Sequence, residues 1–154
     1  MMATVDAANL TAREAPAEPS PSGADLARAW FEHSPFIRLL ELRLVSIGTD
    51  DAVVEMPFRA ELATAGDLVH GGAIGSLIDT AAALAAWSGH DPSDGARWGT
   101  IGMSVSFLAA GRAQALRARS RVSRRGKSIC HCRVEVTDDD GSPVAEGLVA
   151  YRLG

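Results

Sequence analysis

Apolar and polar residues alternate along six stretches of this chain, and one longer stretch between them is almost wholly apolar. Alternation with a period of two is typical of a strand that buries one face. It is clearest over residues 128–137, where Cys130 and Cys132 flank His131. The sequence Asp139-Asp140-Gly141 is a strong hairpin signal, which favours antiparallel pairing. The segments predicted as strands are 41–47, 52–58, 97–108, 113–124, 128–137 and 143–153.

The apolar stretch predicts one long helix over residues 71–88, with Gly89 as its stop. A short amphipathic helix is predicted over residues 25–33. Six strands joined largely by hairpins, with one apolar helix after the second, indicate an α+β fold whose sheet covers that helix. Residues 59–69 are predicted as a loop leading into the helix. Residues 1–23 hold three prolines and no hydrophobic period, so they predict a disordered tail before a single domain over 24–154.

Composition and charge narrow the class of protein. The chain has 154 residues, 47% hydrophobic and 22% charged, with a net charge of −4, so the overall balance does not favour a nucleic-acid partner. The start lacks a signal peptide, and no uncharged apolar stretch is long enough to span a membrane. The two cysteines lie two residues apart on one predicted strand, where they are poor disulfide partners, so we expect them to be reduced thiols. We therefore expect a cytoplasmic protein without a membrane partner.

Asp79 is the only charged side chain between Gly71 and Gly89. Burying an unpaired carboxylate is costly, so an Asp in such an apolar helix indicates a function or a good partner. Gly71 and Gly72 follow His70 at the helix start, where backbone N–H groups and the positive dipole end suit a developing oxyanion. The two features together suggest attack on a carbonyl. The structural alternative is that Asp79 is merely hydrated on a polar side of the helix.

The helix also carries a narrow stripe of small residues at helical spacing, namely Gly72, Gly75, Ser76, Asp79 and Ala83. Such a stripe lets another backbone or a thin ligand approach closely. Gly71 and Asp79 are eight residues apart, about 12 Å along the helix axis. An oxyanion donor must lie about 3 Å from its oxygen, so one helix cannot easily place both groups on one carbonyl. Two antiparallel copies can, which predicts a homodimer with two sites in its interface.

At this point the sequence resembles a known group. The segments VHGGAIGSLIDTAAALAA, TIGMSVSFLAAGR, RVSRRGKS and VEVTDDDGSPVAEG resemble the PaaI-type hotdog acyl-CoA thioesterases. The resemblance implies a hotdog fold, with a six-stranded antiparallel sheet wrapped around one central helix. It also implies dimers that often dock as tetramers, and hydrolysis of acyl-CoA thioesters without a metal or other cofactor.

The resemblance assigns roles to individual residues. Asp79 would be the nucleophile or the base that activates water, and the Gly71 N–H would polarise the thioester carbonyl, with Gly72 allowing close approach. Thr100 matches a Ser/Thr position that helps to orient the Asp or the water. Many members carry Asn six residues before the His, where this chain has Thr64, so the supporting contact near the carbonyl differs. His70 itself is expected to order the loop.

A basic stretch separates Asp94 from Glu135, with nine Lys and Arg residues and no acidic residue. Arg117, Arg119 and Arg121 alternate and so share one strand face. We expect the following turn, Arg124-Arg125-Gly126-Lys127, to contact the phosphates of coenzyme A. The alternative is a solvated edge with solubilising charge. RNA binding is disfavoured because the stretch lacks interleaved aromatic residues.

Two rival functions remain on the same fold. A non-catalytic acyl-CoA-binding protein, acting as a sensor or carrier, would bind the thioester without turning it over. A hydratase would need a His–Asp pair near the helix start, and Asp79 lies too far along the helix for that. A metal site at Cys130-His131-Cys132 is disfavoured because alternation places His131 on the face opposite the cysteines. The sequence therefore predicts a thioesterase whose acyl group cannot be read from it.

Overall fold

The computed structural model describes residues 21–91 and 98–153. Its main sheet has six strands, all paired antiparallel, as the hairpin pattern predicts. Strands β1 and β5 form the two edges of this sheet. In the order in which they pair, the strands are β1 (Arg43–Gly48), β2 (Asp51–Met56), β6 (Leu116–Arg125), β7 (Ile129–Thr137), β8 (Pro143–Arg152) and β5 (Gly99–Phe107).

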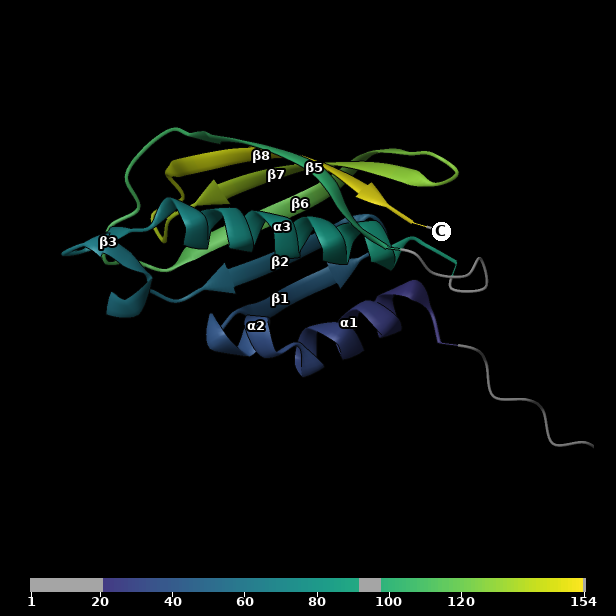
Figure 1. Ribbon diagram of the computed structural model, residues 1–154, viewed down its shortest axis with the longest axis horizontal. Helices are drawn as coiled ribbons and strands as arrows, with labels where there is room; N and C mark the ends of the chain where they lie inside the picture. Colours follow the sequence, from purple (N-terminus) through teal and green to yellow (C-terminus); the bar gives the residue numbers. More distant parts are fainter. Residues whose placement is uncertain (1–20, 92–97, 154) are drawn as a thin grey trace, which may run out of the picture.

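The sheet curves around the long helix α3 (Gly71–Ser88), which lies along its concave face (Figure 1). The helix is buried over most of its length because its side chains are apolar nearly all round. Leu77, Ile78 and Leu84 are fully buried against the sheet. The helix approaches β8 so closely that a Cβ added at Gly147 would lie 2.5 Å from Cγ2 of Ile78. The predicted α+β fold, with a sheet wrapped around one central helix, is confirmed.

Two short helices precede the sheet. Helix α1 (Gly23–His33) packs against α3, and α2 (Pro35–Leu39) follows it directly. Helix α1 begins two residues before the predicted start because Ser22 and Asp25 form a capping box, with the Ser22 N–H donating to the Asp25 carboxylate at 3.0 Å. The prediction of a tail over 1–23 lies mostly outside the described residues, although Gly23 belongs to α1. Helix α2 was not predicted from the sequence.

The predicted loop over 59–69 is wrong. It holds a turn of 3-10 helix η1 (Ala60–Leu62) and a small hairpin of β3 (Ala63–Ala65) and β4 (Leu68–Val69). Gly66 makes the turn with a φ of +55°, a conformation that suits glycine. Strands of two or three residues are too short to show a period. This hairpin delivers the chain to the start of α3, where the His70 N–H donates to the Leu62 carbonyl at 2.8 Å.

The alternation in β7 places the two cysteines on the buried face and His131 on the exposed face, as predicted. Cys130 and Cys132 are free, buried thiols, and the Cys132 Sγ lies 3.6 Å from the Ala82 carbonyl of α3. The neighbouring Cys130 thiol and burial raise the pKa of Cys132. His131 is exposed on the opposite face. Within residues 21–91 and 98–153, no helix has both the length and the apolar character needed to cross a bilayer.

Candidate active site

A groove of about 480 Å³ runs between α3 and the edge strand β5. The stripe of small residues predicted on the helix forms one wall, except for Ala83, which is buried in the core, and β5 forms the other. The structure thus brings together Asp79, both glycines of the helix start and Thr100. The groove is lined by Gly71, Gly72, Gly75, Ser76 and Asp79 from α3 and by Thr100, Met103 and Val105 from β5.

Asp79 is half-buried in this groove, and its partner is Thr100. The Thr100 hydroxyl donates to Oδ1 of Asp79 at 2.5 Å. No ion pair joins Asp79 to a cation among the residues that the structure describes. The carboxylate is therefore held by a neutral hydroxyl at the surface of the groove. This arrangement differs from the alternative of a hydrated side chain without a partner.

Thr100 reaches Asp79 because of a bulge in β5. Strict alternation would place Thr100 and Met103 on opposite faces of the strand. The pairing of β5 with β8 shifts between Thr100 and Gly102, so Thr100 pairs with Tyr151 and Met103 pairs with Val149. Tyr151 and Val149 are both buried on the side of the sheet that faces α3. Thr100 and Met103, which pair with them, therefore face α3 as well.

At the start of α3, some backbone N–H groups have acceptors within the chain and one does not. His70 is the N-cap residue, and its Nδ1 accepts the Gly72 N–H at 2.8 Å. The His70 carbonyl accepts from Ala73 and Ile74 at 3.0 and 3.2 Å. In the described part of the chain, no acceptor contacts the N–H of Gly71. The helix thus presents one free amide, at its positive dipole end, to the groove.

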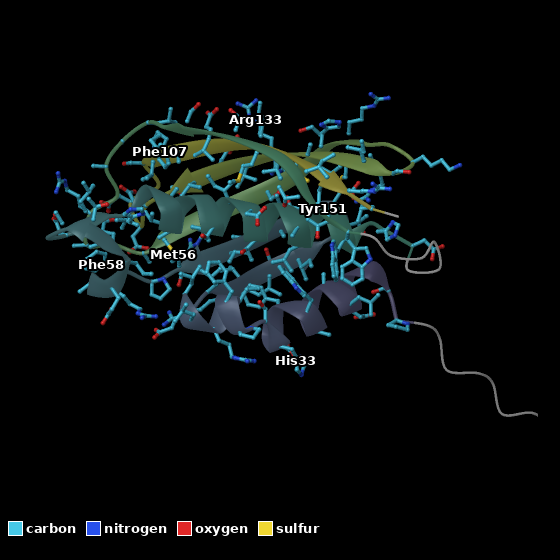
Figure 2. All side chains as sticks on the ribbon, viewed as in Figure 1. His33, Met56, Phe58, Phe107, Arg133 and Tyr151 are labelled. Atoms are coloured by element: carbon cyan, nitrogen blue, oxygen red, sulfur yellow. The ribbon has the colours of Figure 1, made fainter. Side chains whose placement is uncertain are left out.

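Phe107 and Tyr151 mark the two ends of α3 (Figure 2). A Cβ added at Gly71 would lie 3.1 Å from Cζ of Phe107, so this ring covers the helix start. The sequence analysis placed residue 107 within the predicted strand 97–108 and did not link it to Gly71. Thr64 lies on the exposed strand β3 and is not among the described residues that line the groove.

The predicted phosphate-binding turn is divided in the structure. Arg124, Gly126 and Lys127 line a surface hollow of about 330 Å³, together with His131. Arg125 instead turns inward, where it forms an ion pair with Asp50 and donates to the Ala86 carbonyl of α3 at 2.9 Å. Arg125 therefore ties the turn to the end of the helix.

Carboxylates on β2 offset much of the predicted basic face. Arg117 pairs with Glu55 at 2.7 Å, and Arg119 and Arg121 both lie 3.2 Å from Asp51. Among the described residues, Arg124 and Lys127 form no such ion pair. Within the described part of the predicted basic stretch, the cations that form no ion pair with a carboxylate are thus Arg124 and Lys127, at the junction of β6 and β7.

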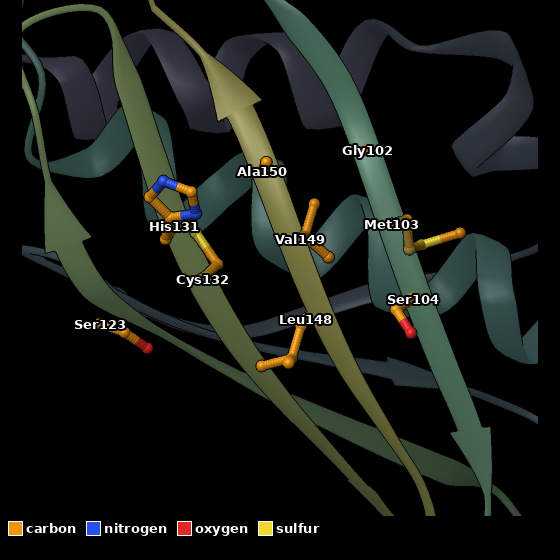
Figure 3. A pocket seen from close by; sticks show the side chains of 9 residues that line it. All are labelled: Gly102, Met103, Ser104, Ser123, His131, Cys132, Leu148, Val149 and Ala150. Atoms are coloured by element: carbon orange, nitrogen blue, oxygen red, sulfur yellow. The ribbon is translucent and has the colours of Figure 1, made fainter.

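Another hollow, of about 440 Å³, lies on the sheet over β5, β7 and β8 (Figure 3). Leu148 and His131 project from it, and much of the remaining lining is small, with Gly102, Ser104, Ser123 and Ala150. Its lining includes the imidazole of His131 but no carboxylate, whereas the groove between α3 and β5 is lined by Asp79.

The six-stranded antiparallel sheet around one helix is the hotdog fold predicted from the resemblance, and the family comparison assigns the chain to the thioester hydrolases. The family model of the thioesterase superfamily matches residues 66–145, just over half of the chain, and the chain belongs to that superfamily. The expectation drawn from the resemblance is therefore confirmed for the family and the fold.

Individual relatives agree with this assignment. The medium/long-chain acyl-CoA thioesterase YigI of Salmonella typhimurium is 28% identical over 137 residues, covering 79% of this chain and 87% of its own. The solved structure of PA5202 from Pseudomonas aeruginosa is 29% identical, with a TM-score of 0.72, and covers 79% of this chain and 94% of its own. The E. coli PaaI protein, at 24% identity, shares the fold with a TM-score of 0.75 over 86% of this chain and 94% of its own.

Proposed function

We propose that this protein is an acyl-CoA thioesterase that converts an acyl-CoA and water into a free acid and coenzyme A. The observation that carries the proposal is that Asp79 lines the groove, accepts a hydrogen bond from Thr100 and has no ion-pair partner among the described residues. The printed activity of the relative YigI supports acyl-CoA as the substrate. The free thiols Cys130 and Cys132 support a reducing, cytoplasmic location.

The active site is assembled from two protomers. Gly71 and Asp79 of one helix are about 12 Å apart, too far to act on one carbonyl. A two-fold axis across the groove brings Gly71 of one protomer to Asp79 of the other. The edge strand β5 supports this seam because it exposes large apolar side chains beside the groove, with Ile101, Met103 and Phe107 each 45% to 58% exposed.

Asp79 acts in one of two ways, and both conserve atoms and charge. As a general base, it takes a proton from water while the water oxygen bonds to the carbonyl carbon and the C–S bond breaks. As a nucleophile, its oxygen bonds to that carbon, the thiolate leaves, and water then hydrolyses the mixed anhydride. In either case, the partner's Gly71 N–H stabilises the oxyanion, and the departing thiolate of coenzyme A takes up a proton.

The remaining residues position these groups. Thr100 orients the Asp79 carboxylate, and His70 orders the helix start by engaging the Gly72 N–H, which leaves Gly71 free. Arg124 and Lys127 attract the phosphates of coenzyme A at the β6–β7 turn, with Gly126 giving close approach and Arg125 fixing the turn. Thr64, on the hairpin strand β3, takes the place of the family Asn that makes the supporting contact near the carbonyl.

The direct test is release of free thiol from a panel of acyl-CoAs, comparing the wild type with Asp79→Asn. We expect Asp79→Asn to lower kcat by about 100-fold or more, as loss of a general base or nucleophile does. The matched control is Asp140→Asn, an exposed carboxylate on the β7–β8 hairpin, which should retain full activity. An Asp79→Asn variant as active as the wild type would overturn the mechanism.

The same panel separates the rival functions. Tight binding of acyl-CoA by the wild type, with no thiol released from any substrate, would indicate a non-catalytic carrier or sensor. Hydration of crotonyl-CoA without thiol release would indicate a hydratase. Either result would contradict the proposed function.

A further inference from the structure

Tyr151 is a buried phenol adjacent to the groove that the proposed reaction does not use. Only 5% of its surface is exposed, and its hydroxyl accepts a hydrogen bond from Nε1 of Trp87 at 2.8 Å. Trp87 lies on α3 eight residues after Asp79, about 12 Å further along the axis. The Trp87–Tyr151 bond therefore ties β8 to the end of α3, as the Thr100–Asp79 bond ties β5 to its middle.

Thr100 lies directly opposite Tyr151 in the sheet. The two residues are register partners across β5 and β8, which places their Cβ atoms about 5 Å apart on the face toward α3. Strand β5 is an edge, so β8 is its one hydrogen-bonded neighbour in the described sheet. Thr100 also lies between Gly99 and the bulge before Gly102, where the regular pairing of β5 with β8 is interrupted.

Two neighbouring aromatic rings hold Trp87, the residue that donates to Tyr151. The Trp87 ring contacts Trp30 of α1 and Trp98, with ring centroids 5.6 and 4.1 Å away. The indole is 8% exposed, so its N–H has a fixed direction. A rigid donor on the helix thus holds the phenol on β8, beside the threonine that contacts Asp79.

The protonation state of Tyr151 suits this task. Burial raises the pKa of Tyr151 to about 12, the negative charge of Asp79 adds to the rise, and the bond from Trp87 opposes it. The phenol is therefore neutral under ordinary assay conditions and adds no second negative charge beside Asp79.

We propose that Tyr151, held by the indole of Trp87, is a positioning residue for the active site: it fixes Thr100, and Thr100 orients the carboxylate of Asp79. The inference rests on the proposed function, because it assigns a role within the same site. It predicts that removing the phenol hydroxyl acts on catalysis only through Thr100.

The experiment is a double-mutant cycle in the full chain, with kcat and KM for an acyl-CoA that the wild type hydrolyses. We expect Tyr151→Phe to lower kcat about tenfold and change KM by less than twofold, the size of effect seen within one hydrogen-bonded network. In a Thr100→Val background, the same change should lower kcat by less than about twofold, because the link to Asp79 is already broken. Trp87→Phe removes the same bond from the helix side and should give the same pattern.

A stability control separates positioning from general loosening. Val144→Ala removes buried packing at the far end of β8 and should lower the melting temperature without lowering kcat. The proposal is overturned if Tyr151→Phe leaves kcat unchanged, lowers it equally in both backgrounds, or matches the effect of Val144→Ala. An active Asp79→Asn variant would instead defeat the proposed function itself, so the two failures are distinguishable.

Discussion

At the scale of single residues, the start of α3 depends on which amide each acceptor takes. His70 Nδ1 engages the Gly72 N–H, and the His70 carbonyl takes the next two amides. The amide left over belongs to Gly71, the first residue of the helix. Proline is favoured at this position of a helix and lacks an N–H. The chain thus offers a substitution that deletes the proposed oxyanion donor while keeping the helix.

We predict that Gly71→Pro lowers kcat by about 10² to 10³, the loss expected for one oxyanion donor, and that Gly71→Ala lowers it by about tenfold or less. Both variants place a Cβ 3.1 Å from Cζ of Phe107, an exposed ring that can rotate away, so they share the steric change. His70 is already extended, at φ −67° and ψ 135°, as a residue before proline must be. The kcat of each variant is measured by thiol release, and its melting temperature shows whether it is folded. Equal losses of kcat in the two variants would contradict the donor role of Gly71.

At the scale of elements, strand β6 ends in two neighbouring arginines, Arg124 and Arg125, that have different contacts. Arg125 reaches the β1–β2 turn at Asp50 and the last turn of α3 at Ala86. The Asp50 N–H also donates to the Ser88 hydroxyl at 3.0 Å, which adds a second bond between the β1–β2 turn and the end of α3. Arg124 faces the surface hollow instead. One side chain thus holds the elements together, and its neighbour remains available to substrate.

We predict that Arg125→Met lowers the free energy of unfolding by roughly 2 kcal/mol, because it removes hydrogen bonds made by a charged, partly buried group. Arg124→Met should change that free energy by less than about 0.5 kcal/mol. It should instead raise KM for acyl-CoA about fivefold with kcat unchanged, the effect of one lost surface contact to phosphate. Denaturant unfolding and steady-state kinetics on both variants test this, and a reversed pattern would refute the division of roles.

The elements that could be predicted are those whose pattern extends over several residues. The helix over 71–88 matches α3, and the segment 128–137 differs from β7 by one residue, because both carry a long unbroken period. The β3–β4 hairpin was missed because its strands are too short for any period. The bulge that turns Thr100 toward α3 depends on pairing with β8, which local sequence does not encode.

The candidate site divides in the same way. Asp79 could be found because a lone carboxylate in an apolar helix stands out against its neighbours. Thr100 was reached only through the family resemblance. The bond between Trp87 and Tyr151 joins residues 64 apart in the chain and leaves no local pattern. From the sequence, Arg125 was predicted to be one more cation of a basic turn. Only its contacts with Asp50 and Ala86 in the structure show that its role differs from that of Arg124.

At the scale of the whole molecule, the chain carries both proposed catalytic groups but holds them at separate points of one helix. The groove between α3 and β5 lies beside large apolar side chains that β5 exposes to solvent. Burying those side chains against a second copy removes apolar surface from water and is favourable. The same contact completes the site, so dimer formation and activity should be lost together.

The central claim, that Asp79 of one protomer acts with Gly71 of its partner, is tested most directly by mixing two inactive variants. Protomers carrying Asp79→Asn and protomers carrying Gly71→Pro are refolded together in equal amounts, and thiol release is compared with that of each variant alone. A mixed dimer holds one site with both groups intact, so random pairing should restore about a quarter of wild-type activity. Mixed dimers that form, as shown by differently tagged protomers purifying together, yet stay as inactive as their parents would contradict the shared site.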